Sequence, residues 1–397
     1  EGEMMRPYIP VFNADFGFDE RTAIHQHIAT DKFITAGKHV TRFEKEFGAH
    51  IGRRYCTMVN SGSSALLVAV KAMGWKPGDK VITPAVTFPT TIAPLLHFGI
   101  TPVFVDVEEA TYNIDPAKTQ ETIRRVDGIV GAVIPHTLGN PVDPMLWMLF
   151  ADTVEDACDA FGSEIHGRKC GTFGTVSTFS FFPAHHITTG EGGMVCTAHE
   201  QLNAEIVKYV NWGRACWCKP GFDSTCGKRL DYEVDGIPYD HKYAFDVAGF
   251  NLKPLDLCGV IGRVQLAKAE RFKQTRARNF EILDRGFAEI EDLVIRPKAL
   301  PEASPCFFGY PITLRKGNRA EITKRIEEKG VATRLVFGGN ITRQPMMKGM
   351  EIIAPCGLEQ SDKVMSSSYI VGCNHTITEE EAHYIVKTNI EAIKDGI

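Results

Sequence analysis

Residues 60–91 have the sequence NSGSSALLVAVKAMGWKPGDKVITPAVTFPTT, and this stretch decides the fold class. A helix-like apolar segment, ALLVAVKAMG, is followed by a strand-like segment, DKVITPAVTF. The alternation continues through TTIAPLLHFG, TPVFVDV, GIVGAVIP and LFADTVEDA. Alternation of this kind predicts an α/β fold with a mainly parallel sheet covered by helices. Ligands bind such sheets at the carboxyl ends of the strands, so residues that follow each apolar run are candidates for a site.

The composition excludes several classes of protein. The chain has 397 residues and a formal net charge of −5 without a basic block, so no nucleic-acid partner is expected. It has no long uninterrupted apolar run and no apolar signal region near its first residue, so we expect neither membrane attachment nor export. Eleven cysteines without an export signal favour a reducing compartment, which we take to be the cytoplasm.

A loop and a change of pattern divide the chain. Residues 211–256 are aromatic and turn-rich with little periodicity, and a loop this long is usually functional. From residue 257 the sequence has the pattern of a long amphipathic helix, and the segments after it indicate a smaller α+β domain. We therefore expect a large domain over residues 1–260, including the loop, and a small domain over residues 261–397.

Two short motifs suggest a binding site for a phosphorylated pyridine. NSGSSAL, at residues 60–66, is a glycine-serine turn that opens a helix, where free N–H groups attract an anion. The alternative is an ordinary helix N-cap. VEDACDAFG, at residues 154–162, places Asp156 at a strand end, where a buried carboxylate could pair with a protonated ring nitrogen. The alternative for Asp156 is a helix-capping role.

The third motif is SFFPAHHITTGEGG, at residues 180–193. With the two motifs above and with PAVTFPTT, VFVDV, GFNLKPLD and RQP, the chain resembles the DegT, DnrJ, EryC1 and StrS family of sugar aminotransferases along its whole length. The resemblance implies a fold-type I, aspartate aminotransferase-like architecture that binds pyridoxal or pyridoxamine 5′-phosphate. It also implies a homodimer with shared active sites.

Family positions assign roles to individual residues. The phosphate is expected at Ser63, Ser64 and Ser180, the ring nitrogen at Asp156, and the two ring faces at Phe88 and Asp159. Asn251 matches a residue that the neighbouring subunit lends to the phosphate.

His185 stands where the family's aminotransferases have lysine. A transaminase needs a primary amine at this position to form a Schiff base with its cofactor. An imidazole can only serve as a general acid or base. Free pyridoxamine phosphate would then condense with a ketone, and removal of a proton by His185 would expel the C3 hydroxyl of a 4-keto-6-deoxy sugar. The alternative is a structural histidine in an inactive aminotransferase; His186 is expected to lie behind His185.

Four cysteines suggest a metal centre. Cys158, Cys216, Cys218 and Cys226 are separated by 57, 1 and 7 residues, and sets of four thiolates suit [2Fe–2S] or zinc. The resemblance is strongest to the [2Fe–2S] 3-dehydratases that act on CDP-4-keto-6-deoxyglucose in 3,6-dideoxyhexose synthesis, as for lipopolysaccharide O-antigens. It implies an NAD(P)H-dependent flavin and iron–sulfur reductase as partner.

Substrate contacts are predicted less directly. Arg334 and Arg343, with Gln344, could bind the diphosphate of a nucleotide sugar, and so could Lys253. The alternative for these charged residues is that they are ordinary solvated surface charges. Phe182 stands where the resembled dehydratases have tyrosine, which puts the match to their substrate in question. Three other functions stay open: a nucleotide-sugar aminotransferase, a glutamate-dependent 3-dehydratase, and a non-catalytic iron–sulfur or zinc regulatory protein.

Overall fold

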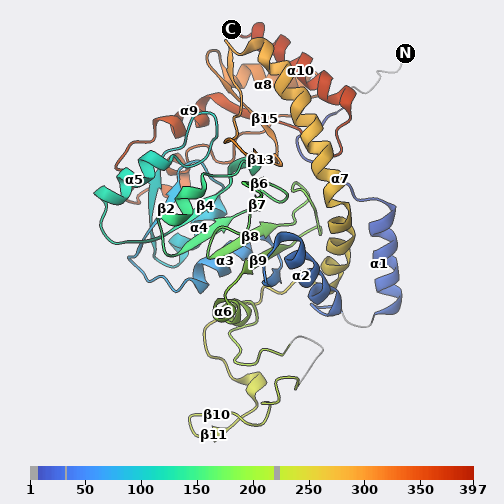
Figure 1. Ribbon diagram of the computed structural model, residues 1–397, viewed down its shortest axis with the longest axis vertical. Coiled ribbons are helices and arrows are strands. Elements are labelled where there is room, and N and C mark those ends of the chain that lie inside the picture. The colour runs from blue at the N-terminus through green and yellow to red at the C-terminus, as the bar shows by residue number, and fades with distance from the viewer. Residues whose placement is uncertain (1–7, 32–33, 219–223) are drawn as a thin grey trace.

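The computed structural model of the chain describes residues 8–31, 34–218 and 224–397. Its centre is a seven-stranded sheet in the order β1-β9-β8-β5-β4-β2-β3 (Figure 1). Neighbouring strands from β8 to β3 run parallel, and β9 is antiparallel to both β1 and β8. The predicted mainly parallel α/β sheet is confirmed. Its strands are β1 (Tyr55–Val59), β2 (Lys80–Pro84), β3 (Thr101–Val105), β4 (Ile129–Pro135), β5 (Thr153–Asp156), β8 (Val176–Ser180) and β9 (Gly193–Thr197).

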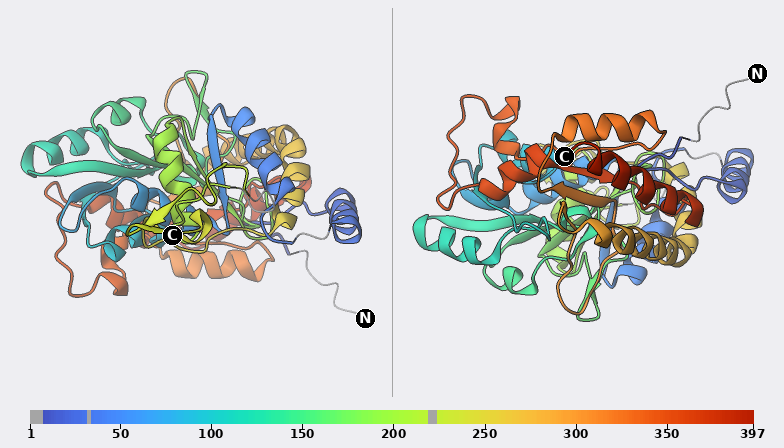
Figure 2. Two further views of the ribbon diagram at one scale, coloured as in Figure 1. Left: turned by 90° about the horizontal axis from the view of Figure 1, so that it is seen from below. Right: turned by 90° about the horizontal axis from the view of Figure 1, so that it is seen from above.

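Helices cover both faces of this sheet (Figure 2). Successive side chains of a strand point to opposite faces, so Val81 and Val133 pack with one helical layer and Ile82 and Ile134 with the other. The first layer contains α3 (Gly62–Ala72), α4 (Pro89–His97) and α6 (Glu200–Val210), and the second contains α2 (Lys38–Ile51), α5 (Pro116–Arg125) and the first half of α7 (Asp256–Phe287). Helix α1 (Phe18–Thr30) packs against α7 at the edge of the molecule.

A second, smaller core lies at the other end of α7. Strands β12 (Val294–Ile295), β14 (Tyr310–Leu314) and β15 (Ser368–Val371) form an antiparallel sheet. Its apolar side chains pack with Leu283 and Phe287 of α7 and with α8 (Arg319–Glu328) and α10 (Glu379–Lys394). Helix α9 (Glu359–Ser367) precedes β15. The expected boundary near residue 260 falls within the first turns of α7, which serves both cores, and the division into two domains stays a prediction.

The segment between α6 and α7 leaves the body of the molecule below α6 (Figure 1). The regular secondary structure of its described residues is a short hairpin and a 3-10 turn. The hairpin pairs two strands of two residues each, β10 (Glu233–Val234) and β11 (Ile237–Pro238), and the turn is at His241–Tyr243. The remaining short strands, β6 (Glu164–Ile165), β7 (Arg168–Lys169) and β13 (Ala303–Ser304), form a separate three-stranded sheet. Among the helices of the described ranges, none is both long enough and apolar enough to cross a membrane.

Candidate active site

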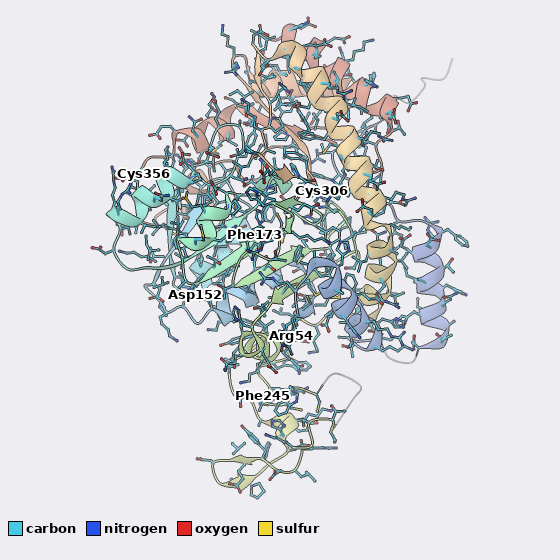
Figure 3. The ribbon with its side chains drawn as sticks, viewed as in Figure 1. Arg54, Asp152, Phe173, Phe245, Cys306 and Cys356 are labelled. Carbon is cyan, nitrogen blue, oxygen red and sulfur yellow. The ribbon has the colours of Figure 1, made fainter. Side chains whose placement is uncertain are left out.

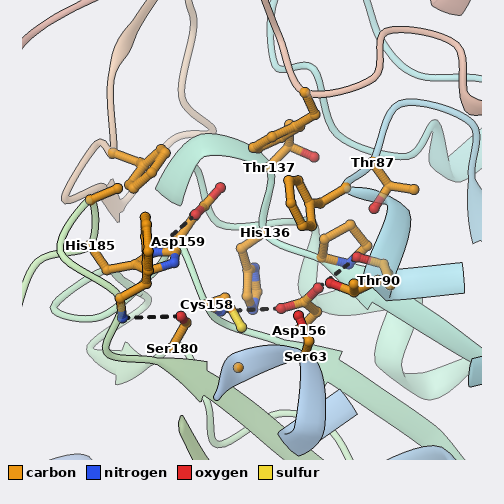
Figure 4. A pocket seen from close by; sticks show the side chains of 18 of the residues that line it. Ser63, Thr87, Thr90, His136, Thr137, Asp156, Cys158, Asp159, Ser180 and His185 are labelled. Atoms are coloured by element: carbon orange, nitrogen blue, oxygen red, sulfur yellow. Dashed lines mark hydrogen bonds and ion pairs between the residues drawn. The ribbon is translucent and has the colours of Figure 1, made fainter. Parts of the chain in front are cut away.

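A cavity of about 530 Å³ opens at the carboxyl ends of β2, β4, β5 and β8 (Figure 4). This is the edge of the sheet that the alternation of helices and strands predicts for a ligand. Nine of the residues singled out from the sequence line it: Ser63, Phe88, Asp156, Cys158, Asp159, Ser180, Phe182, His185 and Arg334.

One end of the cavity is built for an anion. Ser61 is the N-cap of α3, and its hydroxyl accepts a hydrogen bond from the Ser64 N–H at 3.0 Å. The N–H groups of Gly62 and Ser63, in the first turn, point out of the helix N-terminus, where the helix dipole favours negative charge. Gly62 is needed here because a Cβ at this position would lie 2.5 Å from the Cβ of Ser180. The close approach brings the hydroxyl of Ser180, at the end of β8, to the same end of the cavity as Ser63.

Asp156, the last residue of β5, is only 6% exposed and lines the cavity. Its carboxylate accepts hydrogen bonds from the Thr91 hydroxyl at 2.8 Å and from the Cys158 N–H at 3.2 Å. Burial raises the pKa of the Asp156 carboxyl, against the opposing effect of the hydrogen bonds from Cys158 and Thr91. No cationic side chain of the described residues forms an ion pair with Asp156, so a cationic ligand nitrogen would be a favourable partner.

His185 lies next to Asp159 in the wall of the cavity (Figure 4). His185 Nδ1 lies 3.4 Å from Asp159 Oδ1, within ion-pair distance but without hydrogen-bond geometry. The imidazole packs at a ring-centroid distance of 5.0 Å from Phe308. Because the carboxylate faces Nδ1, it favours the tautomer with hydrogen on Nδ1 and leaves Nε2 free to accept a proton.

Aromatic side chains form much of the remaining wall. Phe88, the N-cap residue of α4, and Phe182 line the cavity while about half of each side chain is exposed. Phe12, Phe308 and Phe337 complete this wall. These half-exposed aromatic side chains stand next to the polar residues of the cavity floor. Such a cavity fits a planar ring that carries a more polar substrate.

Six residues predicted to contact the cofactor or the substrate lie outside the cavity: Ser64, His186, Asn251, Lys253, Arg343 and Gln344. The Ser64 N–H and hydroxyl are within hydrogen-bond distance of the Ser61 hydroxyl. The His186 imidazole is within hydrogen-bond distance of the Cys306 carbonyl at 2.7 Å, and burial, with nearby Arg276, holds its pKa well below the ordinary value.

Arg343 forms an exposed ion pair with Asp362 at 2.8 Å, which accounts for its charge without a ligand. Asn251 and Lys253 lie on the surface near α6, where Lys253 Nζ donates to Asn251 Oδ1 at 2.6 Å and sits 3.2 Å from the Trp212 ring centre. Burial and the charge of Arg214 lower the pKa of Lys253 to about 8. An exposed Asn251 is available to a second subunit, and its role there stays a prediction.

The loop brings three of the four predicted metal ligands together. The ligand atoms of Cys216, Cys226 and His241 all lie within 4.8 Å of one another, and Cys218 Sγ accepts a hydrogen bond from the Cys226 N–H at 3.3 Å. Against the effect of burial, hydrogen bonds from Thr225 and Cys226 lower the pKa of the Cys218 thiol to about 7.

The fourth predicted ligand, Cys158, lies elsewhere, in the wall of the cavity beside Asp156 (Figure 4). Burial and the charge of Asp156 raise the pKa of its thiol well above the ordinary value. Other cysteines are dispersed: Cys306 and Cys356, for example, lie on well-separated parts of the molecule (Figure 3). All eleven cysteines are free thiols.

Sequence reasoning missed Thr91, His136, Thr137 and His241. The first three follow or face strand ends, and inspection of every residue after the run GIVGAVIP would have found His136 and Thr137. His136 is buried, with Nδ1 accepting from the Val142 N–H at 3.1 Å and Nε2 facing Glu155 at 2.9 Å, so it is a fixed wall of the cavity. His241 carries no spacing signal, and only the structure places it beside the thiols.

These groups fit a pyridine phosphate. The cavity has an anion site at the α3 N-terminus, aromatic walls, and the buried Asp156 carboxylate, with which no cationic side chain in the described part of the chain forms an ion pair. The loop separately offers soft donors, thiols and an imidazole, of the kind that bind zinc or iron–sulfur clusters. The cavity therefore matches the pyridoxal or pyridoxamine phosphate that the sequence predicts, and the iron–sulfur cluster stays a prediction.

Comparisons with known proteins agree with this geometry. Residues 16–389 match the DegT/DnrJ/EryC1/StrS aminotransferase family. The chain is 40% identical over 395 residues to dTDP-4-dehydro-2,6-dideoxy-D-glucose 3-dehydratase of Saccharopolyspora spinosa, covering 94% of this chain and 84% of that protein. It is 38% identical over 374 residues to lipopolysaccharide biosynthesis protein RfbH of Salmonella typhimurium, covering 90% of this chain and 85% of that protein.

A solved structure extends the likeness to three dimensions. E. coli GDP-4-keto-6-deoxy-D-mannose-3-dehydratase with bound hydrated PLP superposes with a TM-score of 0.85 at 26% identity, covering 97% of this chain and 99% of that chain. The expected fold of pyridoxal-phosphate aminotransferases is thereby confirmed. From the family match over most of its length and from these relatives, the chain is a member of the DegT/DnrJ/EryC1/StrS aminotransferase family.

Proposed function

We propose that the protein removes the C3 hydroxyl of a nucleotide-linked 4-keto-6-deoxyhexose, with pyridoxamine 5′-phosphate as cofactor. The observation that carries this proposal is His185, an imidazole in the cavity wall at the position where the family's aminotransferases have lysine. An imidazole can move a proton but cannot hold the cofactor covalently.

The surroundings of His185 support a role as base. Asp159 lies 3.4 Å from Nδ1, so Nε2 is the nitrogen that takes the proton and Asp159 stabilises the imidazolium that results. The packing of the ring against Phe308 restricts its orientation. Positioned acid–base groups of this kind contribute about 10²–10⁴-fold to rate.

The cofactor, when bound, supplies an electron sink next to the ketone carbon of the substrate. Asp156 holds the proton on the ring nitrogen, and its burial strengthens that interaction. Ser63, Ser180 and the α3 N-terminus bind the phosphate, with Asn251 of a second copy as an added contact in a homodimer. Phe88 and Asp159 face the two sides of the ring.

Replacement of the C3 hydroxyl by hydrogen requires two electrons and two protons: the C3–O bond breaks, water leaves and a C3–H bond forms. A [2Fe–2S] cluster held by the loop thiols Cys216, Cys218 and Cys226, with Cys158 as the fourth predicted ligand, would supply one-electron transfer for this reduction. The electrons would come from an NAD(P)H-dependent flavin and iron–sulfur reductase.

Arg334 is the cationic side chain of the cavity that best suits the diphosphate of the substrate. The sequence resemblance favours CDP-4-keto-6-deoxyglucose, whereas the named relatives include enzymes of dTDP-linked and GDP-linked sugars. Phe182 cannot donate a hydrogen bond to the sugar, so the substrate's contacts at this side of the cavity are apolar.

A second candidate is a glutamate-dependent 3-dehydratase, in which an amino donor regenerates the cofactor. It is favoured by the structural likeness to GDP-4-keto-6-deoxymannose-3-dehydratase, which has been solved with a trapped PLP–glutamate geminal diamine. The thiols and the imidazole gathered in the loop have no task in that cycle.

The two candidates differ in the source of electrons, which is a flavin and iron–sulfur reductase in the first and L-glutamate in the second. Protein loaded with pyridoxamine phosphate is incubated with CDP-, dTDP- or GDP-linked 4-keto-6-deoxyhexose, with either L-glutamate or a reduced flavin and iron–sulfur reductase. We expect turnover to a 3-deoxy product with the reductase and the CDP sugar, and a single turnover without it. Multiple turnovers with glutamate alone would establish the second candidate.

The variant His185→Asn should lose at least about 10²-fold in kcat while it retains the cofactor. His199→Asn is the matched control, because His199 is exposed and outside the cavity. If His185→Asn keeps full activity, His185 is not the base and the proposal fails.

A further inference from the structure

A second cavity, of about 620 Å³, lies where α1, the start of α2 and the first half of α7 meet, and it shares no lining residue with the cavity that contains His185. Helix α1 lies beside α7 at the edge of the molecule (Figure 1). Two histidines line this second cavity, His27 of α1 and His39 of α2. A ring nitrogen of each, and a carboxylate oxygen of Asp256 in the first turn of α7, all lie within 4.8 Å of one another. Donor groups from three helices therefore converge on one point.

One nitrogen of each imidazole is held by a shared carboxylate. His27 Nδ1 and His39 Nε2 lie 3.0 and 3.2 Å from Asp31 Oδ2, within hydrogen-bond distance. A hydrogen bond from Lys38, together with those from the two imidazoles, holds the pKa of Asp31 well below its ordinary value, so this carboxylate is an ionised acceptor. Neutral imidazoles that donate to it carry their lone pairs on the other nitrogens, His27 Nε2 and His39 Nδ1.

His39 Nδ1 is a buried atom that has no hydrogen-bond partner among the residues that the structure describes. Buried polar atoms are nearly always satisfied, so a lone pair left without a donor indicates a ligand. The His27 ring stands edge-on to the His39 ring, with 5.2 Å between the ring centroids.

Asp256 supplies negative charge at the same point. Its Oδ1 accepts hydrogen bonds from the N–H groups of Gly37 and Val40 at 2.9 Å each, which fixes the carboxylate at the N-terminus of α2. Its Oδ2 makes a longer contact, 3.4 Å, with the His39 N–H. Oδ2 is therefore the carboxylate oxygen that is more available to a cation.

The charges around the cavity favour a cation over an anion. Its cationic lining residues are Lys38, Arg263 and Lys268, and each forms an ion pair with a carboxylate: Asp31 for Lys38, Glu46 for Arg263, and Glu20 and Asp19 for Lys268. An anion would have to compete with these carboxylates, whereas a metal ion would meet two imidazole lone pairs and a carboxylate oxygen.

We infer that His27, His39 and Asp256 bind a divalent transition-metal ion, of which zinc best suits two imidazoles and one carboxylate, with water from the cavity as the fourth ligand. The ligand atoms of such a site approach to about 3.3 Å from one another when the ion is bound. Asp31 orients both histidines by accepting from their other nitrogens, as carboxylates commonly do for histidines that bind zinc.

The ion would join α1 to the α2–α7 pair. This site belongs to neither the cofactor cavity nor the loop thiols, so the inference does not depend on the proposed function. It predicts a second kind of metal site in the chain, with nitrogen and oxygen ligands in place of sulfur.

The first test is the number of zinc ions per chain after the full-length protein, purified without oxygen, is dialysed against micromolar free Zn²⁺. We expect the wild type to hold one more zinc ion than His27→Gln, His39→Gln or Asp256→Asn, because zinc bound by the loop thiols is common to all four proteins. Asparagine at position 256 keeps an oxygen that can cap α2. His25→Gln is the matched control, since His25 is exposed on the same helix as His27 and should bind zinc like the wild type.

Asp31→Asn separates an orienting residue from a ligand. We expect it to keep the zinc ion with about 10–100-fold weaker affinity. Complete loss of the ion from Asp31→Asn without any loss from Asp256→Asn would overturn the ligand set. Equal zinc content in the wild type, His27→Gln and His39→Gln would overturn the site itself.

A second measurement needs no variant and therefore does not depend on their folding. In crystals of the wild type grown with Zn²⁺, anomalous scattering at the zinc edge should show a peak between His27, His39 and Asp256. No peak at this point, with zinc confined to the loop thiols or to surface side chains, would also overturn the inference.

Discussion

His185 Nδ1 lies 3.4 Å from Asp159 Oδ1, and the two residues come from the ends of neighbouring parallel strands, β8 and β5. Only the fold brings them together, because 25 residues separate them in the chain. The pair resembles other histidine–carboxylate pairs in which the acid fixes the tautomer of the base.

Replacement of Asp159 by asparagine should therefore affect catalysis more than binding. We expect Asp159→Asn to lower kcat by about 10²-fold, because the amide can present its N–H group to Nδ1 and favour the wrong tautomer. Cofactor affinity should change by less than about threefold. Steady-state kinetics and titration with pyridoxamine phosphate measure the two quantities.

The control for Asp159→Asn is Asp292→Asn, an exposed carboxylate remote from the cavity. A kcat equal to that of the wild type in Asp159→Asn would mean that Asp159 does not position His185.

The contact between α3 and β8 predicts the effect of a single methyl group. In Gly62→Ala the new Cβ would lie 2.5 Å from the Ser180 Cβ, so the helix N-terminus must move away from β8. Overpacking of this kind costs about 1–3 kcal/mol, and here we expect part of it as a roughly tenfold weaker binding of the cofactor phosphate.

Gly17→Ala is a suitable comparison, because a Cβ at Gly17 meets no atom nearer than 3.8 Å. Calorimetric titration with pyridoxamine phosphate distinguishes the two variants. Equal affinities would show that the α3 N-terminus is not the phosphate site.

A shared active site can be tested by complementation. Ser180→Ala and Asn251→Ala should each impair both sites of a homodimer. In a mixed dimer of the two variants, one site would carry both changes and the other would be intact. We expect such mixed dimers to recover about half of the wild-type activity. Activity no higher than that of either variant alone would show that each site takes Ser180 and Asn251 from the same chain, which contradicts a shared site.

Low pH should destabilise the protein, because a largely buried histidine, His375, must then be protonated. Burial, together with the charges of Arg276 and Arg271, lowers the pKa of His375 to about 3 from an ordinary value of 6.5. Between these values the folded state binds fewer protons than the unfolded state, so stability is full above about pH 6.5 and is lost as pH falls toward 3. The loss is at most about 1.4 kcal/mol for each pH unit.

His375→Phe keeps the stacking on Phe272, where the ring centroids are 3.9 Å apart, and removes the titrating group. Its free energy of unfolding, measured by urea denaturation at pH 7, 6, 5 and 4, should fall less steeply than that of the wild type. The exposed His199→Gln should follow the wild type. Parallel curves for His375→Phe and the wild type would show that His375 does not carry the effect.

Much of the fold and of the cavity could be predicted from local patterns. Alternating apolar segments predicted the sheet, and Asp156, Ser180 and His185 could be found because residues at strand ends converge on one edge. Pairings between distant residues could not. Nothing near Arg343 in the sequence indicates that Asp362 neutralises it. His241 was missed because its proximity to Cys226 depends on the fold of the loop, in which the His241 N–H donates to the Arg229 carbonyl at 2.9 Å.

The most direct test of the account is the fate of the C3 oxygen. Protein loaded with pyridoxamine phosphate and supplied with a reduced flavin and iron–sulfur reductase is mixed with a nucleotide-linked 4-keto-6-deoxyhexose that carries ¹⁸O at C3, and products are identified by mass spectrometry. We predict release of the ¹⁸O as water and a sugar without oxygen at C3, at a rate that depends on His185. A 4-amino sugar that retains the ¹⁸O label would contradict the account and identify the protein as an aminotransferase.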